Sequence, residues 1–242
     1  MFRRFLLAAM IMANGGLLTA QTETSATLTL RSVSADAVPG ESDDAAALRF
    51  LSVLEAKNAE TKSLSAEFTQ IRTDSVMFDE VKSSGKFWYQ SPNKFRASYK
   101  SDNSSEIWMD GERMVEHIPS MKQVYIVPMD SGDDAPISQL LLGFGVKVSK
   151  IQKLFTIKSA KAPNQSIVSI NFISKDLDKT MNFSGIRVDF DRASAKPLTI
   201  NLQDDQSSIT MNLRKIELNP KLKADVFEVP KKWPEGTDVS AQ

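Results

Sequence analysis

The sequence of 242 residues contains no cysteine and a single histidine, His117. Without cysteine the chain forms no disulfide and offers neither a thiol nucleophile nor a thiolate metal ligand. Only His117 could act as the base of a Ser-His pair, and it lies in a strand-like run where a half-buried structural position is the simpler interpretation. No GxSxG, P-loop or HExxH pattern occurs. We therefore expect no enzyme, no metal and no cofactor.

An excess of charge of one sign is also lacking. The 30 lysines and arginines balance the 30 acidic residues, so the formal net charge at pH 7 is +0. Since no basic block is present, nucleic acid is not an expected partner. After the first twenty residues, no run is long and apolar enough to span a membrane, which takes about 20 residues.

The first twenty residues read "MFRRFLLAAMIMANGGLLTA" and have the organisation of a secretory signal peptide. Arg3 and Arg4 precede an apolar stretch, and cleavage is expected near Ala20. A membrane anchor is the alternative, whereas a lipid-modified leader is excluded because no cysteine follows. Residues 21–44 are rich in Ser, Thr, Ala and acids and are interpreted as a flexible tether. One domain is expected over residues 45–242.

Alternation of apolar and polar residues runs through most of this domain. It predicts ten or eleven short antiparallel strands, which begin with "SAEFTQIR" and end with "SSITMNLRKIEL". The dipeptide Asp110-Gly111 between two such runs is typical of a hairpin turn. Ahead of the strands, residues 43–60 carry leucines near helical spacing and predict an amphipathic helix. Short, regularly spaced strands indicate one large sheet or barrel.

The sequence contains more apolar residues than one face of such a sheet can bury. In "GKFWYQSPNKFR", residues 85–96, three consecutive aromatic residues must point to both faces. A short Pro-led segment, residues 135–145, is expected to form a helix that presses on an apolar surface through Leu140, Leu141, Leu142 and Phe144. An ordinary barrel core is the alternative, and Trp88 and Trp108 fall on the other face. The inward-facing set expected from alternation is Phe68, Phe87, Tyr89, Phe95, Ile107, Met109, Val124 and Ile126.

The order of these motifs resembles a known family. An amphipathic helix is followed by "SLSAEFTQ", "GKFWYQSPNKFR", the hairpin "MDGERMVEHIP", the Pro-led "APISQLLLG", then "LQDDQSS" and "FEVPKKWPEGTDV". This order is similar to that of the periplasmic outer-membrane lipoprotein carriers of the LolA type. The resemblance covers roughly residues 45–240, and it rests on the order and spacing of the motifs across the domain.

The resemblance implies an incomplete, half-open antiparallel β-barrel of about 11 strands, closed by a short helical lid over a cavity that holds acyl chains. It also implies a non-enzymatic, chaperone-like transport protein of the periplasm, acting as a monomer. Its expected partners are acylated lipoproteins, an inner-membrane lipoprotein-releasing ABC transporter and an outer-membrane acceptor.

One position departs from the family pattern. Many members carry an arginine just before the proline of the Pro-Asn turn, where it hydrogen-bonds to the lid and helps release the cargo. Here that position is Ser91, so the latch does not carry over, and Arg72 and Arg96 are the candidates to replace it. The departure leaves the cargo open. A carrier or sensor of another amphiphile, such as a glycolipid or a fatty-acyl compound, is the alternative function.

Overall fold

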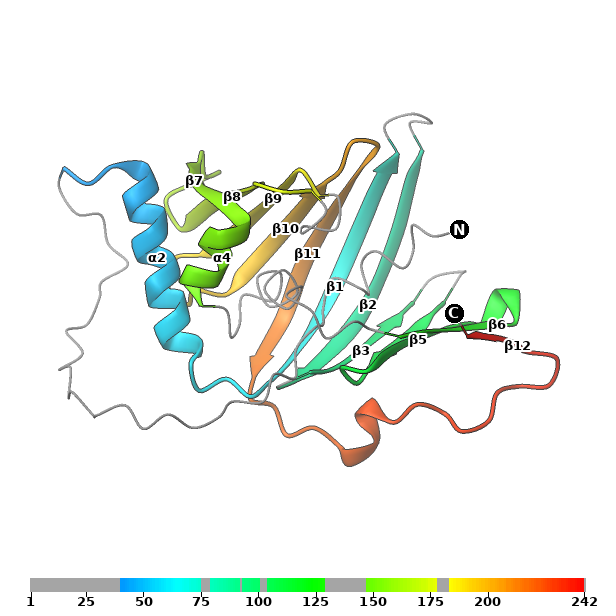
Figure 1. Cartoon of the computed structure of the whole chain (residues 1–242). Helices are drawn as coiled ribbons and strands as arrows, with labels where there is room; N and C mark the ends of the chain where they lie inside the picture. The colour runs from blue at the N-terminus through cyan, green and yellow to red at the C-terminus, as the bar shows by residue number, and fades with distance from the viewer. Residues whose placement is uncertain are drawn as a thin grey trace.

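A single curved sheet organises the computed structural model, which describes residues 40–74, 79–91, 93–100, 104–128, 147–177 and 183–241. Twelve strands follow the order β12-β6-β5-β4-β3-β2-β1-β11-β10-β9-β8-β7. Neighbouring strands are antiparallel, apart from β12, which pairs parallel with β6. The sheet bends around two helices and remains open (Figure 1). This confirms the predicted half-open barrel, with twelve strands where about eleven were expected.

The elements lie close to their predicted positions. The helices are α2 (Asp43–Asn58), η2 (Pro119–Met121), α4 (Val148–Leu154) and η4 (Ala224–Phe227). The strands are β1 (Ser63–Asp74), β2 (Glu80–Gln90), β3 (Lys94–Tyr99), β4 (Glu106–Met109), β5 (Arg113–Ile118), β6 (Gln123–Pro128), β7 (Phe155–Ala160), β8 (Ile167–Ser174), β9 (Gly185–Asp191), β10 (Pro197–Gln203), β11 (Ser207–Leu218) and β12 (Asp238–Ala241). Two elements, α4 and β12, were not predicted. Strand β7 begins only at Phe155, because Ile151 and Leu154 have helical spacing and pack on the core as the end of α4.

Helix α2 begins where the sequence supplies a cap. The Ser42 side chain accepts a hydrogen bond from the Ala45 amide at 3.3 Å, and two acidic residues occupy the first turn. Asp44 accepts hydrogen bonds from Lys158 Nζ at 2.6 Å and from the Ser159 amide at 3.1 Å. These bonds tie the helix to β7, and they lower the pKa of Asp44, the lysine bond most.

The apolar side of α2 packs on the concave face of the sheet. Phe50 is 2% exposed, and its ring lies 5.4 Å from the ring of Phe190 on β9. In Figure 1 both α2 and α4 lie over the half of the sheet formed by β7–β10. At this end the fold is therefore an ordinary helix-on-sheet core.

Strands β1 and β11 form the seam between two halves of the sheet. On one side β2–β6 follow one another in chain order, and on the other β10–β7 do so in reverse. Across the seam Phe68 pairs with Leu213, and a register shift lies between Ser65 and Glu67. Polar and apolar residues alternate over residues 63–68 of β1 and 208–213 of β11, which fixes the register because a one-residue slip would invert both faces.

Over β4–β6, the convex face is covered by the C-terminal segment that follows β11. A second apolar cluster forms there from Trp108, Val115 and Val124, with Val229 and Trp233 of the segment packed against it. The rings of Trp108 and Trp233 meet edge to face at 6.0 Å. Thus the second face of the aromatic strands is buried by the chain's own C-terminus, which ends as β12 beside β6 (Figure 1).

Arg96 joins this segment to the sheet. Its guanidinium lies 5.5 Å from the ring centroids of both Trp88 and Trp108, and it forms a 3.0 Å ion pair with Glu106. Its Nη1 donates a hydrogen bond to the carbonyl of Val226 at 3.1 Å. The arginine therefore occupies the convex face, with its donors directed to an acid and to the C-terminal segment.

Replacing Trp233 by alanine should lower the free energy of unfolding by about 1–2 kcal/mol, because a half-buried aromatic contact is lost. Urea unfolding measures the change, and the emission of Trp108 should shift to longer wavelength as its cover is removed. Lys232→Ala, at an exposed neighbouring position, is the matched control. Equal stability of the two variants would contradict the docking of this segment.

Stability should also fall in mild acid through His117. Its ring lies 4.9 Å from that of Trp233, and burial lowers its pKa, with the charge of Glu106 opposing the change. The folded protein binds this proton less tightly than the unfolded chain does. The contribution of His117 to the free energy of unfolding is therefore complete above the unfolded pKa of about 6.5, and it decreases as the pH falls through that value. Unfolding curves at about pH 7.5 and 5.5 should show a smaller difference for His117→Gln than for the wild type.

Candidate functional site

The concave face of β1–β5 carries a continuous apolar surface. Six predicted inward residues lie in the main core cluster and are at most 5% exposed, namely Phe68, Phe87, Tyr89, Phe95, Ile107 and Met109. Tyr89 pairs with Phe95, and Phe95 with Met109, across adjacent strands. The rings of Phe87 and Phe95 stack at 5.9 Å. Alternation along each strand thus places one row of large apolar groups on the concave side.

Val124 and Ile126 do not belong to this surface. Their strand pairs Val124 with His117 and Ile126 with Val115, so both residues lie on the convex face in the cluster around Trp108. The inward prediction for these two residues was wrong. The physical reason is that β6 is apolar at Tyr125 as well, so alternation alone did not identify the inward parity.

The described helices cover the concave face unevenly. In Figure 1 helices α2 and α4 lie over β7–β10, whereas no helix among the described residues lies over β2–β5. The predicted lid residues Leu140, Leu141, Leu142 and Phe144 lie outside the described residues, as do the expected signal peptide 1–20 and most of the tether. The surface of interest is therefore the β2–β5 half of the concave face.

Polar groups interrupt this apolar face at two places. Glu116 on β5 pairs with Ile107 and Tyr125 and is 2% exposed. On β1, Oε1 of Gln70 is buried and accepts no hydrogen bond from the described residues. Burial raises the pKa of Tyr99, and the negative charge of Glu116 raises it further. The face thus combines a large apolar area with a few buried polar groups.

Ser91, at the family's latch position, lies at the end of β2 next to the concave row. Its amide donates to the Lys62 carbonyl at 2.8 Å, and its side chain is hydrogen-bonded to Tyr89. Burial raises the pKa of Tyr89, and this bond opposes the rise. Arg96 is on the convex face, so of the two candidate replacements only Arg72 shares the inward parity of Phe68.

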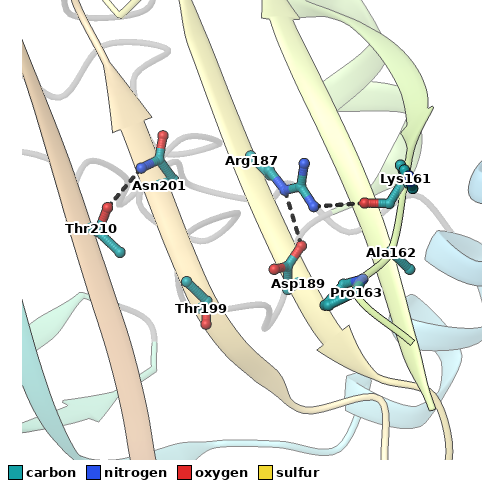
Figure 2. Close-up of a pocket in the computed structure, with 8 residues that line it drawn as sticks. All are labelled: Lys161, Ala162, Pro163, Arg187, Asp189, Thr199, Asn201 and Thr210. Atoms are coloured by element: carbon teal, nitrogen blue, oxygen red, sulfur yellow. Dashed lines mark hydrogen bonds and ion pairs between the residues drawn. The ribbon is translucent and has the colours of Figure 1, made fainter. Parts of the chain in front are cut away.

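A polar groove of about 490 Å³ lies on the opposite face of the sheet, across β9–β11 (Figure 2). Sequence reasoning did not identify it, although the signal was present as polar residues alternating with buried ones along each strand. Its lining residues are Lys161, Ala162, Pro163, Arg187, Asp189, Thr199, Asn201 and Thr210.

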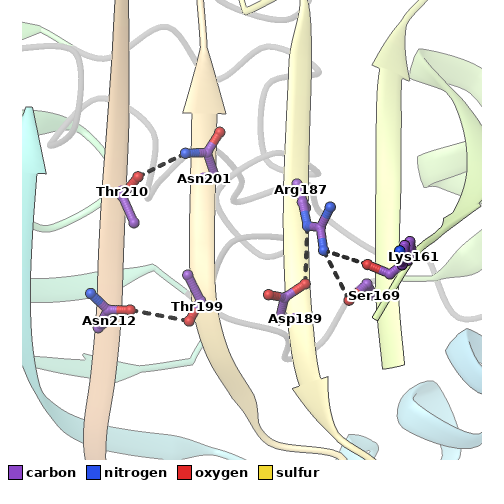
Figure 3. A network of polar contacts seen from close by, with 8 residues as sticks. All are labelled: Lys161, Ser169, Arg187, Asp189, Thr199, Asn201, Thr210 and Asn212. Atoms are coloured by element: carbon purple, nitrogen blue, oxygen red, sulfur yellow. Dashed lines mark hydrogen bonds and ion pairs between the residues drawn. The ribbon is translucent and has the colours of Figure 1, made fainter. Parts of the chain in front are cut away.

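The polar side chains of this groove satisfy one another (Figure 3). Arg187 donates to Asp189 at 3.1 Å, and to the Lys161 carbonyl at 2.9 Å. Asn201 donates to Thr210 at 2.7 Å, and Thr199 to Asn212 at 3.1 Å. Because the donors and acceptors are already matched between neighbouring strands, the arrangement is a ladder that holds the sheet together, and it offers no group poised for catalysis.

Within the described ranges, no three His, Cys, Asp or Glu residues come together in a way that could hold a metal ion. None of the helices described there is long and apolar enough to cross a membrane.

Comparison with known proteins assigns the chain to a family. The family model "Outer membrane lipoprotein carrier protein LolA" matches residues 59–230. An outer-membrane lipoprotein carrier protein of Methylibium petroleiphilum is 28% identical over 76% of this chain and 85% of its own length. Among solved structures, an uncharacterized conserved protein of Thermus thermophilus is 10% identical, covering 79% of this chain and 97% of that one, with a TM-score of 0.49. A LolA superfamily protein of Nitrosomonas europaea is 7% identical, covering 78% and 99%, with a TM-score of 0.39.

The open half-barrel with an apolar concave face, taken with the matched model and the carrier relative, defines a protein of the lipoprotein-carrier type. The chain belongs to the LolA family.

Gly85 should be indispensable to the concave wall. A methyl group there would lie 2.2 Å from the Ser98 carbonyl oxygen and 2.7 Å from Cζ of Phe68. Gly85→Ala should therefore lower the free energy of unfolding by about 1–3 kcal/mol. Gly185→Ala is the matched control, since nothing lies within 4 Å of its added carbon. Thermal unfolding compares them, and two equally stable variants would contradict the close approach.

Proposed function

We propose that this protein is a periplasmic carrier that holds the acyl chains of lipoproteins on the concave face of β2–β5. The observation that carries the proposal is the row of aromatic and aliphatic side chains there, in the part of the chain that the family model matches. Transfer of a chain from water is worth about 0.8 kcal/mol per methylene. Contact between the methylenes of a lipid anchor and these side chains would therefore favour its removal from water.

Shuttling requires that the cargo also be released. In the proposed cycle the protein receives a lipoprotein from an inner-membrane ABC transporter and passes it to an outer-membrane acceptor, acting as a monomer. The segment 135–145, with Leu140, Leu141, Leu142 and Phe144, is the proposed lid. At the latch position Ser91 forms a neutral hydrogen bond with Tyr89. Release in this protein is therefore proposed to proceed without a charged latch at that position.

The proposal is tested by native mass spectrometry of the mature protein, purified without detergent from the periplasm of its own host. An adduct with the mass of an acylated polypeptide supports the lipoprotein carrier. An adduct with a free lipid or glycolipid would overturn the cargo assignment. Protein that stays empty, and that also fails to bind a synthetic triacylated lipopeptide, would overturn the carrier function itself.

Phe87 and Trp88 provide a matched pair, because they are neighbours on β2 that face opposite sides. Phe87→Ala should weaken binding of a triacylated lipopeptide about tenfold, equivalent to about 1.4 kcal/mol of lost contact. Trp88→Ala should leave it unchanged. Competition with a fluorescent acyl probe measures the affinity of both variants. Phe87→Leu is a further control for a folding defect, because this conservative change should cause an intermediate loss of affinity. Equal affinities for Phe87→Ala and Trp88→Ala would exclude the concave face.

A further inference from the structure

The lysines of this charge-balanced chain are unevenly distributed. Residues 147–175 contain six lysines and no arginine, aspartate or glutamate. Two of these lysines are engaged elsewhere: Lys158 is paired with Asp44, and Lys161 lines the polar groove. The other four lie in or beside helix α4.

Helix α4 directs its lysines away from the core. Ile151 is 2% exposed, and Val148 and Leu154 pack against the main cluster. Lys147, Lys150 and Lys153 follow at intervals of three residues on the other side, and all are exposed. The acid nearest to this helix in the hydrogen-bond pattern is Glu55, whose carboxylate accepts the Val148 amide at 3.0 Å.

The fourth lysine is brought beside α4 by the end of β8. The Lys175 amide donates to the Leu154 carbonyl at 2.9 Å, and its Nζ donates to the Gln152 carbonyl at 2.7 Å. Asp176 follows it and is partly buried. Four cations thus gather where α4, β7 and β8 meet, with Asp176 and Glu55 as the acids next to them.

Two large aliphatic side chains flank Lys175 in the sequence, two residues before it and two after it. Ile173 is 46% exposed and Leu177 is 50% exposed. They are two of the five large apolar residues that the described part of the chain leaves exposed, the others being Val81, Met121 and Val239. Ile173 pairs with Thr156 at the start of β7, directly after α4. Exposed aliphatic groups among lysines are typical of a surface that meets a membrane.

We propose that this surface docks the protein on an anionic phospholipid bilayer. We name it the basic corner, and it comprises Lys147, Lys150, Lys153, Ile173, Lys175 and Leu177. The lysines are attracted to anionic headgroups, and the aliphatic groups gain by leaving water for the lipid. An acidic protein partner would match the lysines alone, whereas a bilayer also accommodates the two separate aliphatic side chains.

The magnitude expected is that of a transient contact. Four lysines and two shallow aliphatic groups give only a weak attraction, and salt screens its ionic part. Such a surface lets the protein sample the membrane and leave it. The inference does not depend on what the concave face carries, and it extends the proposed function by adding direct contact with lipid headgroups.

The test is flotation of the full mature protein with unilamellar vesicles. Wild-type protein should float with phosphatidylcholine vesicles that contain about 30% phosphatidylglycerol and not with phosphatidylcholine alone. Raising NaCl from about 50 to 300 mM should release it. The triple variant Lys150→Glu, Lys153→Glu, Lys175→Glu should lose binding at least tenfold.

Matched controls separate the basic corner from net charge and from fold. The variant Lys221→Glu, Lys223→Glu, Lys232→Glu makes the same charge change at exposed positions of the C-terminal segment and should still bind. Ile173→Ser with Leu177→Ser should weaken binding, and Val81→Ser should not. An equal loss of vesicle binding in both lysine variants would overturn the proposal. Wild-type protein that does not bind anionic vesicles would also overturn it. Binding of polyglutamate without binding of vesicles would assign the surface to an acidic protein instead.

Discussion

Strands β4–β6 are apolar on both faces, as is the end of β2, and the architecture depends on covering each face. A β-strand alternates its side chains, so three aromatic residues in a row cannot be buried on one side. The convex side is covered by Trp233 and Val229, with Arg96 held between Trp88 and Trp108. Because the chain supplies its own cover there, the concave side is the face to which the proposed function assigns the acyl chains.

Most strands could be predicted because one face of each is polar and the other apolar, as in Ile186, Val188 and Phe190 on β9. Strand β12 could not, since its short sequence has little apolar content and it forms by pairing with the edge of β6. Helix α4 is only seven residues long, below the length at which periodicity distinguishes helix from strand. The inward face of β6 was predicted wrongly because apolar residues occupy both faces of that strand.

The candidate site was predictable in its apolar part and not in its polar part. Alternation sufficed for Phe87, Phe95 and Met109, which share one face once the strands are paired. The inward position of Glu116 depends on the register of β4 and β5, which the turn sets and composition does not reveal. The basic corner likewise requires the end of β8 to be placed against α4, a long-range contact that a linear pattern does not contain.

The seam between β1 and β11 also has a consequence for how the chain folds. On either side of it, each strand pairs with the one before or after it in the sequence, so the two meanders β2–β6 and β7–β10 are built from local contacts. The seam instead joins Leu64 to Leu218, and closing such a long loop is entropically slow. Folding should therefore be limited by the meeting of two preformed half-sheets, after which β12 seals the free edge of the first.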